Sequence, residues 1–259
     1  ASAVTTITGT AADINTAYSS SDITGLGNEA VIITNSLGNI DIATLNSISI
    51  KTTGVITGTL VTDTVANAAT INTAATDVIT TGITAVMGNG DIANLNTVAG
   101  RTAGVVTGVL SNVTSAQADG ITTAATDQIT VNLNNAAPLV ATELTSIDSK
   151  TAGTVNANAV GVTINGSIGE VTAVRDAAGI NTGVAYASTI APAMTQANIG
   201  DLNALANETG GVVTGTLNSD TVVNAATITT ANSDIITLNI AAGFTQAGIA
   251  NLNTAAGNT

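Results

Sequence analysis

The sequence predicts an α/β repeat solenoid, built from parallel βα coils of about 25 residues that are paired into double repeats of about 50. A leucine recurs as Leu45, Leu95, Leu144, Leu202 and Leu252, at intervals of 50, 49, 58 and 50 residues. The chain is 44% hydrophobic but only 1% aromatic, so its core must consist of thin layers of Ala, Val, Ile and Leu. Regular self-similarity of this kind is typical of stacked repeats, in which each coil covers its neighbour.

Short phrases rich in Val, Ile and Thr predict the strands. Apart from one wide interval, their centres are 23 to 27 residues apart: Ile7, Ile32, Ile56, Ile79, Val106, Ile129, Val155, Val213 and Ile236. β-branched residues fit a pleated surface, and parallel strands would stack about 4.8 Å apart. We expect one further strand in the wide interval, around Gly183–Ala185.

Between the strands the sequence predicts short helices of two kinds. Helices of the first kind have apolar residues at intervals of three positions, as in Ile42, Leu45 and Ile48, which keeps these side chains on one face of the helix. The second is rich in Ala and Thr and is expected over 11–18, 63–73 and 220–230. Capping residues are expected before the first kind (Asn39, Asn89, Thr195, Thr245), acids in its first turn (Asp41, Asp91, Asp201) and glycines after it (Gly54, Gly104, Gly153, Gly211).

These elements predict one continuous array over residues 1–259. Its approximate double repeats are 1–53, 54–103, 104–152, an irregular and longer 153–210, and 211–259. A three-sided parallel β-helix is the alternative, but alanine is poor in strands and favours the version with helices. The two ends of the sequence are nearly in phase, so we expect either a slice of a longer chain or subunits that stack end to end.

The charge balance excludes several classes of function. The net charge is -13, from 17 acidic and 4 basic residues, and the chain has no histidine and no cysteine. Four scattered cations cannot neutralise a row of phosphates, which excludes nucleic acid as a partner. Apolar runs are far shorter than a membrane helix requires, so no membrane span is expected. The acidic, lysine-poor, Thr/Ser/Asn/Gly-rich composition favours an extracellular or cell-surface location.

No catalytic, cofactor-binding or metal-binding residue is assigned, and we do not expect an enzyme. Asp77, Asp127 and Asp234 recur just before strands, and a repeated position favours a structural capping role over catalysis. Calcium remains possible because its ligands are oxygens, but no calcium-binding motif supports it. The one non-repeating charged cluster, Glu170, Arg175 and Asp176, is the place where a polysaccharide-acting enzyme would have its site.

Two further side-chain patterns leave alternatives open. An asparagine follows the helix leucine at Asn46, Asn96, Asn203 and Asn253. It is either part of a buried asparagine ladder like that of leucine-rich coils, whose side-chain amides satisfy loop backbone groups, or an ordinary polar surface residue. Threonines flank the strand phrases and could form an ice-binding plane, although threonine is simply a good strand residue.

The opening stretch Thr6–Tyr18, continued by Ile23–Val31, resembles the repeat region of giant cell-surface proteins of marine cyanobacteria, including those linked to swimming motility. The phrase Lys150–Ala157 is similar to the same family's Thr-Thr-Gly-Thr-Val-Asp-Ala, with Asn156 in place of the aspartate. The resemblance implies secretion, great length and a structural role, and it carries over no catalytic residue.

The predicted function is therefore that of a structural extracellular repeat protein, which forms or belongs to a long cell-surface fibre. Its expected partner is its own kind, through end-to-end self-association or covalent continuation of the array. An adhesion solenoid that contacts polysaccharide, cells or ice is the alternative, and a polysaccharide-acting enzyme is a more distant one.

Overall fold

The computed structural model describes residues 4–134, 136–242 and 245–259, apart from the side chains of residues 220 and 247. Contacts divide the chain into two compact bodies. Body 1 comprises Ala1–Val113, Gly120–Asn132 and Ser149–Thr154, and body 2 comprises Thr114–Asp119, Leu133–Asp148 and Val155–Thr259. The predicted single array over 1–259 stays a prediction.

In body 1, strands follow one another across a parallel sheet in chain order, and helices lie between them in sequence. The elements are β1 (Thr6–Gly9), α1 (Ala11–Ser19), β2 (Ala30–Leu37), η1 (Asn39–Asp41), α2 (Ile42–Ser49), β3 (Ile56–Thr62), α3 (Val65–Ala68), β4 (Val78–Ile83), η2 (Asn89–Asp91), α4 (Ile92–Ala99), β5 (Val106–Val113) and β6 (Gln128–Leu133). We call a strand together with the helix that follows it a βα segment.

Body 2 has more strands than body 1 in the part of the chain that the structure describes, and four of them have only 2 residues. Its elements are α5 (Ser115–Ala118), β7 (Leu139–Val140), α6 (Ala141–Asp148), β8 (Val155–Asn156), β9 (Thr163–Gly166), α7 (Ile168–Asp176), β10 (Ile180–Asn181), β11 (Ala187–Ile190), β12 (Met194–Thr195), η3 (Gln196–Asn198), α8 (Ile199–Glu208), β13 (Val213–Thr221), α9 (Val222–Ala225), β14 (Ile235–Ala242), η4 (Gln246–Gly248) and α10 (Ile249–Gly257). One sheet has the order β12-β13-β11-β9-β7 with β14 on β13, and β8 pairs in parallel with β10.

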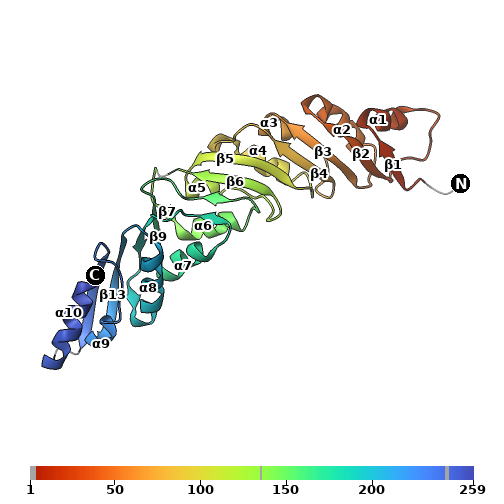
Figure 1. Cartoon of the computed structure of the whole chain (residues 1–259). Coiled ribbons are helices and arrows are strands. Elements are labelled where there is room, and N and C mark those ends of the chain that lie inside the picture. The colour runs from red at the N-terminus through yellow and green to blue at the C-terminus, as the bar shows by residue number, and fades with distance from the viewer. Residues whose placement is uncertain (1–3, 135, 243–244) are drawn as a thin grey trace. The chain divides into compact units, whose positions relative to one another are not determined.

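Burial alternates along the strands because successive side chains point to opposite faces. In β2, Val31 and Ile33 are buried while Ile32 is 42% exposed. The inward side chains pack against helix residues such as Leu45 and Ile48, which are fully buried in the same core. Figure 1 shows the strands of body 1 side by side, from red to green along the chain. The α/β class is thus confirmed, with parallel sheets alternating with helices.

The predicted strand centres all fall in strands, with the exception of the added one. The strand expected at Gly183–Ala185 is wrong: those residues form the connection between β10 and β11. The Ala/Thr-rich helices expected over 63–73 and 220–230 are also wrong in length, since α3 and α9 have 4 residues each. The cause is visible after α3, where the Asn46 side chain binds Thr70 O and Asn72 N and holds that stretch as a loop.

Candidate functional site

The three aspartates that precede strands tie neighbouring βα segments together. In each, Oδ1 accepts from the first strand amide of the preceding segment: Ile56 N to Asp77 at 2.8 Å, Val106 N to Asp127 at 2.7 Å, and Val213 N to Asp234 at 2.8 Å. Oδ2 accepts a 2.8 Å bond from a loop amide three residues upstream, at Ala74, Ala124 and Ala231. All three side chains are buried. The predicted capping role is confirmed, and both oxygens of each carboxylate already accept protein hydrogen bonds.

Buried threonines, which the sequence reading did not single out, make the matching contact on the alternate segments. Thr102 Oγ1 accepts from Ile79 N at 2.8 Å and from Gly104 N at 2.8 Å. Thr151 repeats this with Ile129 N and Gly153 N at 2.8 and 2.9 Å. These threonines could have been recognised from a repeated Thr-x-Gly motif, which begins at Thr52, Thr102, Thr151 and Thr209.

The glycines of this Thr-x-Gly pattern are required by a close approach between segments. A Cβ at Gly104 would lie 2.4 Å from the Ile79 carbonyl carbon, and one at Gly54 would lie 2.3 Å from Glu29 O. A Cβ at Gly153 or Gly211 would likewise lie 2.3 Å from a backbone oxygen, that of Ile129 or Tyr186. Their expected role as helix stops is wrong for α2 and α4, because those helices end at Ser49 and Ala99, several residues earlier.

The asparagines after the helix leucines bind loop backbone of the following segment. Asn96 Nδ2 donates to Gly120 O at 2.9 Å, and its Oδ1 accepts from Thr122 N at 2.8 Å. Asn46 and Asn203 make the same pair of contacts, whereas Asn253 is exposed. The loop-binding alternative is therefore confirmed at three positions, although these side chains are half-buried.

The acids expected in a first helical turn do not all share one position. Asp41 and Asp91 accept 2.9 Å bonds from Gly38 N and Gly88 N at the start of the 3-10 turns η1 and η2. In the corresponding turn η3, the residue that does this is Asn198, whose Oδ1 accepts from Thr195 N at 2.9 Å. Asp201 lies three residues later, in the first turn of α8 as predicted, and its side chain is exposed. Asn39 and Asn89 lie inside the turns, after the capping glycines.

The non-repeating charged cluster separates into a helix cap and an ion pair. Glu170 Oε2 accepts from Ser167 N at 2.7 Å, which caps α7. Arg175 Nε lies 2.8 Å from Asp176 Oδ1 and 3.3 Å from Glu208 Oε2. The hydrogen bond to Asp176 raises the pKa of Arg175, and the same bond lowers the pKa of Asp176. Glu170 and Arg175 thus have different partners, and the cluster does not assemble an acid-base pair.

A buried carboxylate lies in the first βα segments of body 1. Glu29 accepts from the amides of Gly27 and Asn28 and from the Tyr18 hydroxyl. Burial alone would raise the pKa of Glu29, but these hydrogen bonds outweigh it and lower the pKa. Burial, followed by the contact with Glu29, raises the pKa of Tyr18 to about 12. The Glu29 carboxylate thus accepts all of these hydrogen bonds from donors within the protein, which indicates a structural role.

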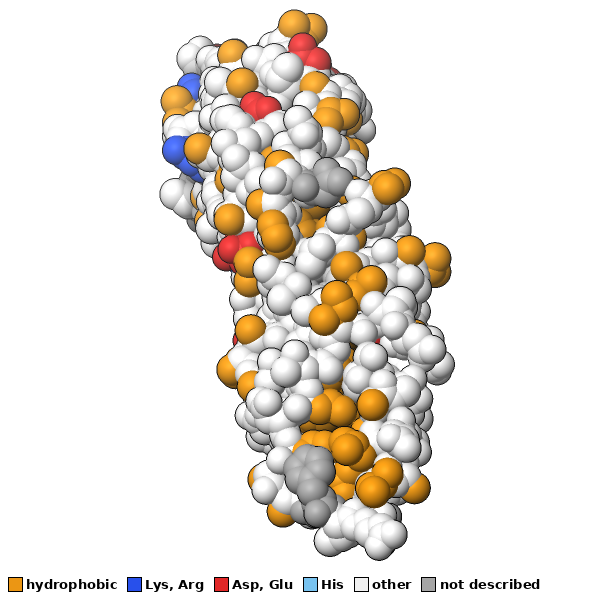
Figure 2. Space-filling view, turned by 90° about the vertical axis from the view of Figure 1, so that its left-hand side faces the viewer, with side chains coloured by type: hydrophobic (Ala, Val, Ile, Leu, Met, Phe, Trp, Pro, Cys, Tyr) orange, Lys and Arg blue, Asp and Glu red, His pale blue; other side chains and the backbone are white. Residues whose placement is uncertain are grey.

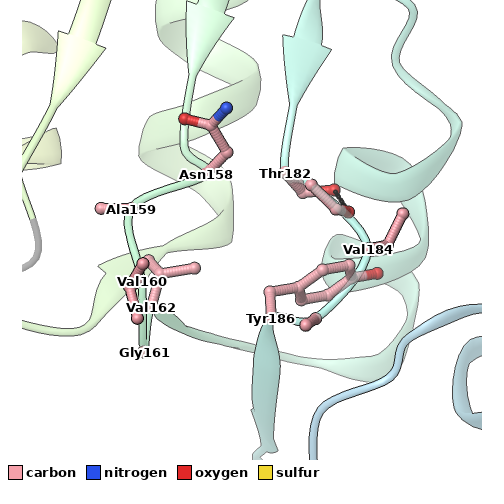
Figure 3. Close-up of a pocket in the computed structure, with 10 residues that line it drawn as sticks. Asn158, Ala159, Val160, Gly161, Val162, Thr182, Val184 and Tyr186 are labelled. Carbon is pink, nitrogen blue, oxygen red and sulfur yellow. Dashed lines mark hydrogen bonds between the residues drawn. The ribbon is translucent and has the colours of Figure 1, made fainter.

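A hollow of about 290 Å³ opens between two loops of body 2. Asn158–Val162 line one side and Thr182–Tyr186 line the other, as Figure 3 shows. Val160 and Val184 are 94% and 83% exposed, while the Tyr186 ring is only 4% exposed. Tyr186 is the single titratable residue in this lining, and burial raises its pKa. A ring this buried cannot serve as a stacking platform for a sugar.

Among residues 4–134, 136–242 and 245–259, no group of three or more acidic, His or Cys side chains is placed to hold a metal ion. In the same ranges, no helix has the length and apolarity needed to cross a membrane. The fold and these contacts define a parallel α/β protein whose neighbouring segments are joined by buried Asp and Thr side chains and by half-buried Asn side chains. No family model, no curated protein and no solved structure matches the chain.

Proposed function

We propose that this chain is a structural repeat protein, a solenoid of stacked βα coils that forms or belongs to a long extracellular cell-surface fibre. One observation carries the proposal: polar side chains form hydrogen bonds that join each segment to the next. Asp77, Thr102, Asp127 and Thr151 bind, in turn, the starts of β3, β4, β5 and β6. When the stabilising contacts are those between adjacent coils, the array can be extended without limit, because every added coil covers the one before it.

The chemistry of the chain supports this reading over catalysis. Its acidic groups at repeat-locked positions are engaged by backbone amides, and its non-repeating charges pair with each other or cap a helix. The helices after the strands favour the βα solenoid over a three-sided β-helix. The acidic, cysteine-free composition and the resemblance to cyanobacterial surface repeats support the extracellular location.

An adhesion function is the second candidate, favoured by the outward face of the body 1 sheet. The exposed positions of the described strands are mostly Thr, Val and Ser, as in Thr57, Thr59 and Val61 of β3, and none is charged. Thr59 and Thr80 lie side by side in register. Cosedimentation with insoluble cellulose or chitin, and inhibition of ice recrystallisation, test this face; a Thr59→Glu, Thr80→Glu double variant should abolish either activity.

The structural proposal is tested on native material. The intact mass is measured under denaturing conditions and compared with negative-stain images recorded before denaturation. Extended rods with a mass many times 25.1 kDa would support covalent continuation of the array, and rods that dissolve into chains of 25.1 kDa would support subunit stacking. Compact particles of that mass would refute the fibre.

A further inference from the structure

Asparagine is directly followed by glycine at two places in the chain, Asn89-Gly90 and Asn165-Gly166. Asparagine is one of the chemically labile residues of proteins. It is most labile in this dipeptide, because a glycine has no Cβ to shield its amide nitrogen from the asparagine side chain. The structure places the two dipeptides in different surroundings, and the surroundings predict which of them reacts.

The first dipeptide lies in an exposed turn. Asn89 and Gly90 are the first two residues of the 3-10 turn η2, and both are exposed. Within the residues that the structure describes, no hydrogen bond holds the Asn89 side chain. The first amide groups of a helical turn have no acceptor inside it, and a Cβ built on Gly90 would have no atom within 4 Å. The Gly90 nitrogen is therefore open to attack the neighbouring side chain.

The three equivalent turns lack this combination. In η1 the bulky Ile40 follows Asn39, and Asn39 Oδ1 accepts a hydrogen bond from Asp63 N at 3.3 Å. The turns η3 and η4 begin with Gln196 and Gln246, whose longer side chains would have to close a larger and less favoured ring. Among these four turns of the described chain, η2 alone is suited to the reaction.

The second dipeptide is held in a sheet. Asn165 and Gly166 belong to β9, which has β7 on one side and β11 on the other, and Asn165 is in register with Val140 and Thr189. Asn165 Oδ1 is buried, and a Cβ at Gly166 would lie 2.9 Å from the Ala141 side chain. Because the ladder keeps the backbone extended, the strand would have to open before the ring could close.

We propose that Asn89 is a site of spontaneous covalent modification, converted through a succinimide to aspartate and isoaspartate. Gly90 N attacks Asn89 Cγ: the N–Cγ bond forms, the Cγ–Nδ2 bond breaks, and Nδ2 leaves as ammonia together with the proton of the Gly90 amide. Water then adds to one of the two ring carbonyls. Opening at Cγ gives aspartate, and opening at the main-chain carbonyl carbon gives isoaspartate, whose main chain runs through Cβ and Cγ.

The turn that would change is attached to β5. Met87 N donates to Val109 O at 2.8 Å, and Met87 O accepts from Ser111 N at 2.9 Å. Directly after this attachment, the Asp91 carboxylate accepts a 2.9 Å bond from Gly88 N. Isoaspartate lengthens the main chain inside the turn and so displaces this carboxylate from its donor. The isoaspartate product should therefore loosen the attachment to β5, whereas the aspartate product only adds a charge.

Timed peptide mapping of the whole chain tests the site. Trypsin cleaves after Lys and Arg, so Asn89 falls in the peptide 52–101 and Asn165 in the peptide 151–175. Folded and urea-unfolded chains are incubated at mildly alkaline pH, and mass spectrometry follows both peptides. In urea the two asparagines should react at similar rates. In the folded chain Asn89 should keep most of its unfolded rate, and Asn165 should react about tenfold more slowly or less, because β9 must first open.

The modified chains can be isolated because the protein has few charges. Only 8% of its residues are charged, and most side chains on the face drawn in Figure 2 are uncharged. Either product adds a carboxylate, so ion-exchange chromatography separates modified from unmodified molecules. Labelling by an isoaspartyl methyltransferase then identifies the isoaspartate fraction.

Variants separate the chemistry from its consequence. Gly90→Ala should slow the reaction at Asn89 severalfold, since a methyl group fits there and shields the nitrogen, and the matched control Gly169→Ala should leave the rate unchanged. Asn89→Asp reproduces the added charge without the longer main chain. Hydrogen exchange at the Ser111 amide should be faster in the isoaspartate fraction than in Asn89→Asp.

Three results would overturn the inference: Asn165 reacting as fast as Asn89 in the folded chain, folding that slows both sites equally, or a Gly90→Ala variant that reacts like the wild type. Equal exchange at Ser111 in the isoaspartate fraction and in Asn89→Asp would refute the loosened turn. The proposed fibre is judged separately, by the mass and images of native material.

Discussion

The junction between β5 and β6 in body 1 differs sharply from the one between β8 and β10 in body 2. At the first, Val106 N donates to the buried Asp127 carboxylate at 2.7 Å. At the second, Val155 N donates to the backbone carbonyl of Gly179 at 2.8 Å, and no aspartate takes part in this contact. Thr145, which follows Leu144, replaces the asparagine found after Leu45, Leu95 and Leu202.

Polar groups are also satisfied less completely in the second region. Six buried side-chain atoms in the described residues lack a hydrogen-bond partner, and five of them belong to Asn165, Thr172, Arg175, Tyr186 and Ser188. Unpaired buried polar groups reduce stability, so the stretch around α7 should open more readily than the junctions of body 1. The difference teaches that regular side-chain contacts, more than the strands themselves, specify how firmly segments are joined.

The largest expected effect breaks a regular junction by steric overlap. Gly104→Ala places a Cβ within 2.4 Å of the Ile79 backbone, and we expect a loss of about 3 kcal/mol in the free energy of unfolding. Gly169→Ala in α7 is the matched control, since no atom lies within 4 Å, and it should be neutral or stabilising by up to about 1 kcal/mol. Urea unfolding followed by circular dichroism measures both; equal effects would contradict the close approach.

A smaller effect follows from removing the carboxylate that joins β5 to β6. Asp127→Ala leaves the amides of Val106 and Ala124 without their acceptor, and we expect a cost of about 2 kcal/mol. Hydrogen exchange should show the loss first at those two amides. Asp176→Ala, which removes an exposed ion-pair partner of Arg175, should leave the free energy of unfolding close to that of the wild type, because solvent screens the pair.

The smallest expected effect concerns Asp148, which lies near the irregular junction between β8 and β10. Unlike the two changes above, its substitution should increase the free energy of unfolding. Burial raises the pKa of Asp148, whose carboxylate packs against Gly179. The folded state therefore binds the proton of the Asp148 carboxyl group more tightly than the unfolded chain does. The protonated group's contribution to the free energy of unfolding is fully present below pH about 3.9 and is lost as pH rises through the folded-state pKa.

Because Asp148 is only partly buried, solvent screens much of this effect. Asp148→Asn should consequently stabilise the chain at neutral pH by no more than about 0.5 kcal/mol, with the gain disappearing in acid. Unfolding free energies of both chains across pH 3 to 8 measure this. A variant that is less stable at neutral pH would show that the carboxylate has a favourable partner there.

Much of the fold could be read from the sequence because its cause is local and repeated. The recurring leucines mark residues that are fully buried, except at Leu252, and the Val/Ile/Thr phrases mark strands. Asp77, Asp127 and Asp234 were correctly assigned to capping because a repeated carboxylate beside a strand start has few other uses. The Ala/Thr-rich helix expected over 11–18 is confirmed by α1, but those expected over 63–73 and 220–230 were too long. Helix propensity does not include side chains of the preceding segment, such as Asn46, which binds the carbonyl of Thr70.

By itself, the sequence determined the α/β class, the positions of nine strands and the buried leucine face, since these follow from side-chain periodicity. Only the tertiary structure decided the role of the Thr-x-Gly pattern. Ile79, whose amide donates to Thr102 and whose backbone lies against Gly104, is more than twenty residues earlier in the chain. Contacts between segments depend on register, and register is a property of the assembled sheet that no single segment contains.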